Sequence, residues 1–378
     1  MIRIKSDKII VGESLFDGYL YVENGKIANL SQEAYPCETE YDFTGKYVSA
    51  GFIDMHTHGA GGHAFMNSEV EDVIAGCDYH LAHGTTTIVP TVSAGEFATM
   101  KQAVVHIHKA KGKTKANILG AHLEGPYLSP KQAGAQCPVF ITPPQKADYE
   151  SLIEEYGESV TRWTYAPEND TNGEFCKYLT SHGVIASAGH TDAKYQDMQV
   201  AIENGCNLIT HLYSCTSTVT RDHGFRSLGV IESAYLRDEL YVEIIADGKH
   251  LPPDLIKMII KIKGTDKVAL ITDSLEIAGT DITEGVMSGT EFIVEDGVCK
   301  LKDRSAFAGS VATADRLIQT LVNECGYSVP TAVKMLTEVP AKILKVNKGV
   351  LEKDKDADIV VFDETIKITD VFVGGNKA

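Results

Sequence analysis

The chain has 378 residues, a length that suits a barrel of about 250 residues with a smaller second domain. Hydrophobic residues make up 43% and charged residues 23%, as in soluble globular proteins, and no apolar run approaches the roughly 20 residues of a membrane span. A formal net charge of −17 argues against nucleic-acid binding, which depends on Lys and Arg. Because residues 1–5 lead into a strand-like segment rather than a signal peptide, we expect a cytoplasmic protein without membrane or nucleic-acid partners.

The eight cysteines form no C-x-x-C pair. Their spacing therefore predicts neither a disulfide framework nor a thiolate zinc site. Most are expected to be small buried residues. Cys215 is the exception, because it follows a candidate site residue, His211, by four positions.

Both ends of the chain have the pattern of antiparallel strands. Residues 8–11, 19–22 and 26–30 alternate in polarity, and Asn24-Gly25 between the last two is a strong hairpin signal. Residues 357–363 and 370–375 have the same character. Because chain ends commonly lie close together, we predict a small β-sandwich domain built from residues 1–49 and 346–378.

The middle of the chain, residues 50–345, alternates apolar strand-like runs with helical stretches. The predicted strands are 51–56, 85–91, 118–123, 162–166, 184–189, 207–211, 241–246 and 268–272. Predicted helices include 69–83, 95–111, 193–205, 253–262, 312–325 and 330–344, and a hairpin is expected around Glu295-Asp296-Gly297. This order predicts an α/β protein with a (β/α)8 TIM-type barrel.

His56-Thr57-His58 ends the first of these strands. Successive strand side chains alternate between faces, so an H-x-H at a strand's end directs both imidazoles toward one metal ion. Two of 13 histidines also fall two apart by chance, as His106-Ile107-His108 illustrates. That second pair lies in a predicted helix, where residues two apart do not share a face, and is expected on the helix surface.

Five of the eight predicted strands end in side chains that can bind metals or transfer protons. They are His56 and His58, Glu124, His190, His211 and Asp273. Any one alone is better explained by a core or surface position, but active sites of such barrels gather at the carboxyl ends of the strands, and all of these residues fall there together. Imidazole and carboxylate suit divalent ions such as zinc, which make bound water acidic. Asp273 is the candidate that takes the water's proton and passes it to a leaving amine.

Seven motifs carry a family resemblance. They are GFIDMHTHG at 51–59, HLEGPY at 122–127, GHT at 189–191, HLY at 211–213, IADGKH at 245–250, TDS at 272–274 and AGS at 308–310. In these motifs the chain resembles the amidohydrolase superfamily and, within it, the N-acetylglucosamine-6-phosphate deacetylases. The resemblance runs nearly end to end, and HLEGP with the downstream ADG-x-H is its most specific part.

The resemblance implies a site for one or two divalent ions per subunit, zinc, iron or manganese. Glu124, His190 and His211 would hold one ion, and Glu124 would bridge to a second ion held by His56 and His58. Many other superfamily members bridge their metals with a carbamylated lysine at the fourth strand's end, but residues 163–167 contain none. This favours Glu124 as the bridge.

The implied reaction is hydrolysis of N-acetylglucosamine-6-phosphate to glucosamine-6-phosphate and acetate. Asp273 would accept the water's proton and deliver it to the departing sugar amine. His250 resembles a family histidine that contacts the sugar phosphate. A family arginine reaches the phosphate across a dimer interface, which implies a homodimer.

The substrate-binding motifs depart from the family pattern. Gln136 stands where the family has a histidine, Ser214-Cys215-Thr216 replaces Asn-Ala-Met, and Arg226-Ser227-Leu228-Gly229 replaces Arg-Glu-Pro-Gly after an insertion that includes Arg221. Glutamine can donate a hydrogen bond but cannot carry a positive charge. The candidate substrate-binding residues are Gln136, Ser214, Cys215, Arg221, Arg226 and His250.

Two interpretations follow from these departures. Either phosphate is still bound, by backbone amides with Arg226 or Arg221 and His250, or the substrate is another N-acylated amino sugar, a galactosamine isomer or an unphosphorylated sugar. We favour the phosphorylated sugar. Hydrolysis of a cyclic amide or a nucleobase, and a non-catalytic scaffold, are the remaining classes; the missing lysine argues against the first and the complete ligand set against the second.

Overall fold

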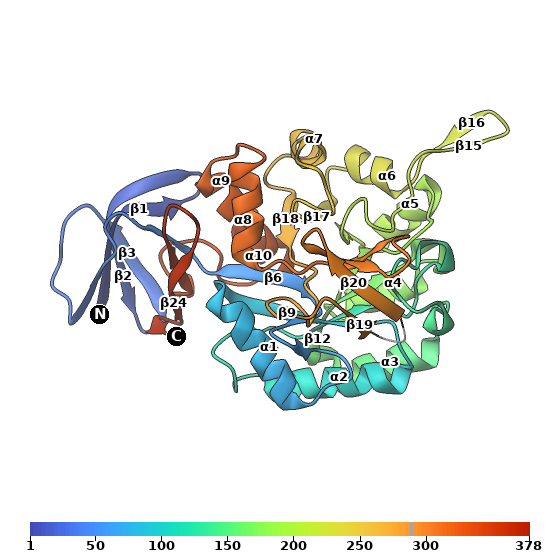
Figure 1. Cartoon of the computed structure of the whole chain (residues 1–378), viewed down its shortest axis with the longest axis horizontal. Helices are drawn as coiled ribbons and strands as arrows, with labels where there is room; N and C mark the ends of the chain where they lie inside the picture. The colour runs from blue at the N-terminus through green and yellow to red at the C-terminus, as the bar shows by residue number, and fades with distance from the viewer. Residues whose placement is uncertain (288–289) are drawn as a thin grey trace.

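The computed structural model describes residues 1–287 and 290–378, with Asp222 described by its backbone alone. Its larger body is a barrel of parallel strands surrounded by helices. Its smaller body lies at one end of the long axis and contains both termini (Figure 1). Among the residues described, no helix is long and apolar enough to cross a membrane.

The small domain is a sheet in which the two ends of the chain pair, as predicted. Its order is β25-β24-β23-β5-β1-β2-β3, with β4 beside β1. Ile359 of β23 lies opposite Ala50 of β5, so the last strands extend the sheet that the first strands begin. Asn24 and Gly25 turn the chain with φ of 51° and 74°, the positive values that a two-residue hairpin needs. The strands are β1 Ile2–Val11, β2 Ser14–Glu23, β3 Lys26–Ser31, β4 Thr39–Asp42, β5 Tyr47–Ala50, β23 Ile359–Phe362, β24 Ile368–Val373 and β25 Asn376–Lys377.

The barrel contains every strand predicted for it. Parallel pairing runs in the order β10-β9-β11-β12-β13-β14-β17-β18, and β6 pairs with β9. These strands are buried on both sides, which is why they read as nearly continuous apolar runs. Their bounds are β6 Phe52–Thr57, β9 Thr85–Ser93, β10 Asn117–Ile118, β11 Ala121–Glu124, β12 Val160–Tyr165, β13 Ile185–Ala188, β14 Leu208–Ile209, β17 Tyr241–Ile245 and β18 Val268–Ile271.

The barrel is nearly closed between β6 and β18. At the carboxyl end, the Asp273 amide donates to the His56 carbonyl at 2.9 Å. Nearer the amino end, Met335 and Leu336 lie between the strands and accept hydrogen bonds from the amides of Leu270 and Ile53, each at 2.9 Å. The edge strands β6 and β18 are therefore joined partly through residues 335–336, which belong to neither strand.

Helices cover the outside of the barrel. α1 is typical, since it buries Val73, Cys77 and Leu81 at intervals of four residues. α2 contains both His106 and His108, but only His108 is exposed, so the expectation of a surface pair is wrong for His106. The α-helices are α1 Val70–Ala82, α2 Phe97–Ala110, α3 Lys146–Tyr156, α4 Glu174–Ser181, α5 Tyr195–Glu203, α6 Val230–Leu236, α7 Pro253–Lys263, α8 Ala314–Asn323, α9 Val329–Lys334 and α10 Glu338–Leu344. Short 3₁₀ turns lie at η1 Pro130–Gln132, η2 Pro138–Phe140, η3 Gly157–Ser159 and η4 Pro167–Asn169.

Three small β elements lie outside the barrel sheet. The hairpin expected around residues 295–297 belongs to an antiparallel sheet, which we call the cover sheet, of β19 Glu284–Met287, β20 Thr290–Glu295, β21 Val298–Leu301 and β22 Phe307–Gly309. β7 Gly59–Ala60 pairs with β8 His63–Ala64. β15 Thr220–Asp222 and β16 Phe225–Ser227 form a hairpin that projects away from the barrel (Figure 1). The expected domain boundaries, after residues 49 and 345, stay a prediction; the first falls one residue before the end of β5 and the second just beyond α10.

Candidate active site

The five predicted metal ligands meet at the carboxyl ends of the barrel strands. His56 is the penultimate residue of β6 and His58 follows that strand, Glu124 ends β11, and His190 and His211 follow β13 and β14. Two groups among the described residues have ligand atoms close enough to hold one ion: His56, His58 and Asp273, and His56, Glu124 and His211. The structure therefore brings together side chains from five strands, and their roles as ligands remain predictions.

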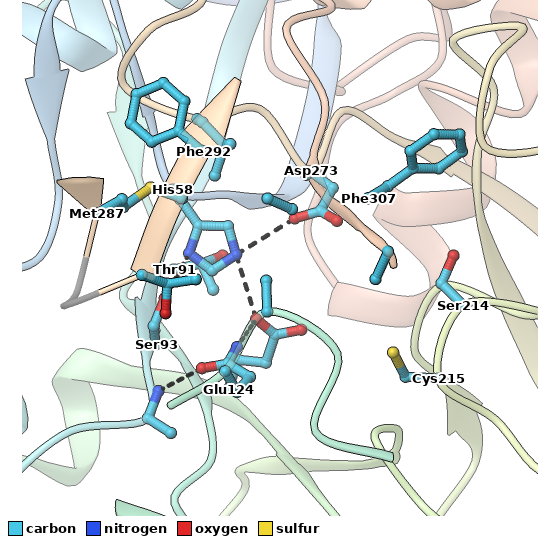
Figure 2. A pocket seen from close by; sticks show the side chains of 18 of the residues that line it. His58, Thr91, Ser93, Glu124, Ser214, Cys215, Asp273, Met287, Phe292 and Phe307 are labelled. Carbon is cyan, nitrogen blue, oxygen red and sulfur yellow. Dashed lines mark hydrogen bonds and ion pairs between the residues drawn. The ribbon is translucent and has the colours of Figure 1, made fainter. Parts of the chain in front are cut away.

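Glu124 lies at the centre of the cluster. Its Oε1 is 2.9 Å from His211 Nε2, 3.2 Å from His190 Nε2 and 3.4 Å from His56 Nε2. Its Oε2 is 3.2 Å from His58 Nε2, whose ring lies between Glu124 and Asp273 (Figure 2). One carboxylate thus reaches all four imidazoles, which is the arrangement that a bridging ligand requires.

The donor set fits a divalent ion. Both ring nitrogens of His56 are buried and have no hydrogen-bond partner, and such orphaned atoms are uncommon in protein interiors. His190 Nε2 and His211 Nε2 face each other at 3.2 Å, while His190 Nδ1 donates to the Gln132 carbonyl at 2.9 Å. That outer hydrogen bond leaves Nε2 of His190 with a free lone pair, as in a metal-bound histidine. Nitrogen and carboxylate ligands together suit zinc, iron or manganese.

The electrostatics of the cluster also favour a cation. Burial lowers the pKa of His56, but the carboxylates of Glu124 and Asp273 outweigh it and raise that pKa to about 10. The same balance of burial against Asp273 and Glu124 raises the pKa of His58 to about 9. Burial raises the pKa of Glu124, yet the neighbouring histidines bring it well below its usual value. The site thus has a negative field that attracts protons or a metal ion.

Asp273 follows β18 and faces the same cluster. Its Oδ1 lies 3.2 Å from His58 Nε2 and 3.4 Å from His56 Nε2. Burial raises its pKa, but the two histidines outweigh burial, so this pKa is lowered and the carboxylate is ionised at neutral pH. The backbone of Asp273 has φ of 48°, and His190 and His211 have φ of 45° and 29°. Such strained conformations concentrate at functional sites.

A pocket of about 510 Å³ opens above the cluster. Asp273, Ser214, Cys215 and Phe307 lie along one side of it, and His58, Met287 and Phe292 along the other (Figure 2). The cover sheet supplies much of the apolar wall. Among the described residues that line the pocket there is no lysine or arginine.

The predicted substrate-binding residues divide into two groups. Gln136, Ser214, Cys215 and His250 line the pocket. Gln136 is already engaged there, because its Nε2 donates to Glu124 Oε2 at 2.8 Å and its Oε1 accepts from the Ala94 amide at 2.9 Å. The Nδ1 of His250 lies 2.8 Å from Asp247 Oδ2, which orients the imidazole.

Arg221 and Arg226 form the second group. Both are exposed on the β15–β16 hairpin, opposite each other in its register, and neither lines the pocket. The Nη1 of Arg226 donates to the Gly224 carbonyl of the same hairpin at 3.0 Å. Within one chain the structure therefore does not bring these arginines to the site.

A set of buried polar residues next to the ligands was not predicted from the sequence. Arg162 on β12 and Glu243 on β17 form a buried ion pair inside the barrel. In the same network, His122 bonds Thr91 Oγ1 at 3.0 Å and Thr164 Oγ1 at 2.7 Å. The available signal was a charged residue within each of two apolar strands, which is unusual for a barrel interior.

Comparison with known proteins places the chain in a family. The model of the amidohydrolase family matches residues 47–378. The chain therefore belongs to the amidohydrolase family and is a metal-dependent hydrolase, as the motifs predicted.

Within this family the chain is similar over nearly its whole length to deacetylases of amino-sugar phosphates. The N-acetylglucosamine-6-phosphate deacetylase of Bacillus subtilis is 30% identical over 378 residues, which cover 97% of this chain and 94% of that protein. The N-acetylgalactosamine-6-phosphate deacetylase of a Shewanella species is 29% identical, covering 93% and 88%. The crystal structure of the N-acetylglucosamine-6-phosphate deacetylase from Pasteurella multocida has a TM-score of 0.93 and 28% identity, covering 100% of this chain and 99% of that one.

Proposed function

We propose that this protein removes the N-acetyl group from an amino-sugar phosphate, N-acetylglucosamine-6-phosphate, and releases glucosamine-6-phosphate and acetate. The observation that carries the proposal is the convergence of Glu124, His190 and His211 with Asp273 at the floor of one pocket. The similarity in sequence and fold to enzymes named for this reaction supports it.

We assign the metal site to His56, His58, Glu124, His190 and His211, with one or two zinc, iron or manganese ions per subunit. When bound, a divalent ion supplies an acidic water and polarises the acyl oxygen. The outer contacts of the ligands hold their rings in place: His190 to the Gln132 carbonyl and His58 Nδ1 to Ser93 Oγ at 3.0 Å.

In the mechanism, Asp273 moves the proton. Its carboxylate is ionised at neutral pH because His56 and His58 lower its pKa, so it can accept the proton of the attacking water. We assign the proton to Oδ2, since Oδ1 already faces His56 and His58. The protonated carboxyl group then donates to the departing amine, which leaves the sugar amine and acetate.

The sugar is assigned from the lining of the pocket and from the relatives. His250, Ser214 and Cys215 line the side of the pocket that we assign to the sugar and its phosphate. A relative named for the galactosamine isomer has nearly the same identity as relatives named for the glucosamine isomer. The galactosamine isomer and an unphosphorylated sugar are therefore the second candidates.

Kinetics on metal-analysed protein distinguish these substrates. The panel consists of N-acetylglucosamine, N-acetylgalactosamine and the 6-phosphate of each, with release of acetate as the common readout. We expect the highest kcat/KM with N-acetylglucosamine-6-phosphate. A higher value with either unphosphorylated sugar would refute the phosphate assignment, and a higher value with N-acetylgalactosamine-6-phosphate would change the isomer.

We also propose a cytoplasmic homodimer. The dimer would bring Arg221 or Arg226 of one copy to the phosphate in the pocket of the other. Two observations support it: both arginines are exposed on a projecting hairpin, and the described pocket lining has no lysine or arginine of its own.

A further inference from the structure

A charged pair lies in the barrel interior directly beneath the metal cluster. Arg162 and Glu243 are both fully buried. Their contact is bidentate: Nη1 of Arg162 pairs with Oε1 of Glu243, and Nη2 lies 3.1 Å from Oε2. Arg162 also donates to Ser187 Oγ at 3.1 Å and to Thr210 Oγ1 at 3.0 Å. The pair is therefore held rigidly by several strands.

The pair faces His56 from the side opposite the cluster. Glu243 Oε2 is 3.6 Å from His56 Nδ1, while His56 Nε2 faces Glu124 Oε1 and Asp273 Oδ1, each at 3.4 Å. Arg162 Nη1 donates to the carbonyl of Met55, the residue before His56, at 3.2 Å. Both the ring and the backbone of this ligand therefore lie against the ion pair.

His56 is the ligand on which this contact has most effect. It belongs to both groups of side chains that can hold an ion. It is also fully buried, and neither ring nitrogen has a hydrogen-bond partner. The separation from Glu243 is only about 0.5 Å longer than an ordinary hydrogen bond, so a small movement of the ring would make the contact.

Stability does not explain why charges occupy this position. A buried ion pair gains little over well-packed apolar residues of the same volume, and branched aliphatic side chains are the usual filling of such barrels. A carboxylate that accepts from the outer nitrogen of a histidine ligand, in contrast, fixes the tautomer and makes the other nitrogen a better ligand. A role in orienting a metal ligand therefore explains the pair better than a contribution to stability does.

We propose that Glu243, held by Arg162, is a positioning residue for His56. Its Oε2 accepts the Nδ1 proton of His56 and leaves the lone pair of Nε2 directed at the divalent ion. The inference rests on the metal site of the proposed function, and it names two residues that set the affinity of that site without touching substrate.

The test is the metal affinity of three variants, measured as competition between holoenzyme and a chelator for zinc. Glu243→Gln keeps the volume but removes the charge, and we expect zinc to bind about 10- to 100-fold more weakly. Because this variant leaves Arg162 buried without a partner, Arg162→Met/Glu243→Gln removes both charges together. Asp358→Asn is the matched control: Asp358 is also buried and bonds Lys348 at 2.7 Å, but it lies outside the metal cluster.

The double variant separates a positioning role from a structural one. We expect it to unfold near the wild-type temperature yet bind zinc as weakly as Glu243→Gln. Wild-type affinity in the double variant, or an equal loss in Asp358→Asn, would overturn the inference. Acetate release is not used here, so a wild-type protein that holds zinc but cleaves no acetyl sugar would refute the proposed function alone.

The tautomer of His56 can also be measured in the wild-type protein. In cadmium-substituted protein, nitrogen NMR should show cadmium coupled to Nε2 of His56 and a proton on Nδ1. Coupling of cadmium to Nδ1 would overturn the inference, because that nitrogen would then be unable to donate to Glu243.

Discussion

At the scale of single residues, a substitution of Asp273 is the most direct test of the proposed proton transfer. Asp273→Asn keeps the size of the side chain but removes the base, so we expect kcat to fall about 100- to 10,000-fold. Metal content should stay at the wild-type level, because Glu124 and the four histidines remain. Acetate release and elemental analysis of the same preparation check both expectations.

Glu124→Ala is the matched variant for that prediction. Glu124 Oε1 contacts three imidazoles, so its removal should lose both bound metal and activity. Full activity in Asp273→Asn would exclude Asp273 as the base. Loss of metal from Asp273→Asn would instead make Asp273 a ligand, which its 3.2 Å separation from His58 permits.

At the scale of elements, His80 joins α1 to the end of β6. Its Nε2 lies 2.9 Å from Thr57 Oγ1 and 3.1 Å from the Gly59 carbonyl, and its buried Nδ1 has no partner. Burial lowers the pKa of His80 to about 4, because a second proton would sit on that unpartnered nitrogen. The neutral form therefore holds the segment that contains His58.

The pH dependence of folding follows from this contact. An unfolded histidine titrates near its ordinary value, so the contribution of His80 is complete above pH 6.5 and is lost as the pH falls from 6.5 to about 4. The loss amounts to about 3 kcal/mol. His80→Gln cannot take up a proton. We therefore expect its free energy of unfolding, relative to that of the wild-type protein, to rise by about this amount when the pH is lowered from 7.5 to 4. Urea unfolding at both pH values measures it, and parallel curves for the two proteins would contradict it.

The same scale shows what sequence could and could not predict about the fold. The barrel strands were predictable because burial on both sides makes them continuous apolar runs. The segment 330–344 reads as one helix but forms α9 and α10 instead, since the carbonyls of Met335 and Leu336 accept from strand amides. Those partners are distant in sequence, and no local pattern reveals them.

The candidate site divides in the same way. His56, Glu124, His190, His211 and Asp273 could be found because polar side chains end otherwise apolar strands. The charged residues within two apolar strands were a weaker signal for Arg162 and Glu243, because a charged residue within a strand usually marks a solvated face and only the closed barrel turns both inward. The position of Arg226 depends on how a loop leaves the barrel, which its sequence does not encode locally.

At the scale of the whole molecule, charge limits how a phosphate can be bound. The protein has a formal net charge of −17, and the described lining of the pocket contains no lysine or arginine. A phosphate dianion in this pocket would therefore gain most from a cation supplied by another surface. The projecting β15–β16 hairpin exposes Arg221 and Arg226, and its Phe225 is 80% exposed, so this hairpin is suited to contact a second copy.

If a second copy supplies the cation, light scattering should give the mass of a dimer. Arg221→Ala/Arg226→Ala should raise KM for N-acetylglucosamine-6-phosphate by about 10- to 100-fold, as expected for lost charge-assisted hydrogen bonds, and leave KM for the unphosphorylated sugar nearly unchanged.

Refolding this variant together with Asp273→Asn tests whether the hairpin of one copy serves the pocket of the other. The mixed dimer has one intact pocket facing one intact hairpin, so it should combine substantial turnover with a low KM, whereas the arginine variant alone has a high KM and Asp273→Asn alone has little turnover. A monomeric protein that still prefers the phosphorylated sugar would contradict the dimer, and a mixture without recovery would mean that each hairpin serves its own pocket.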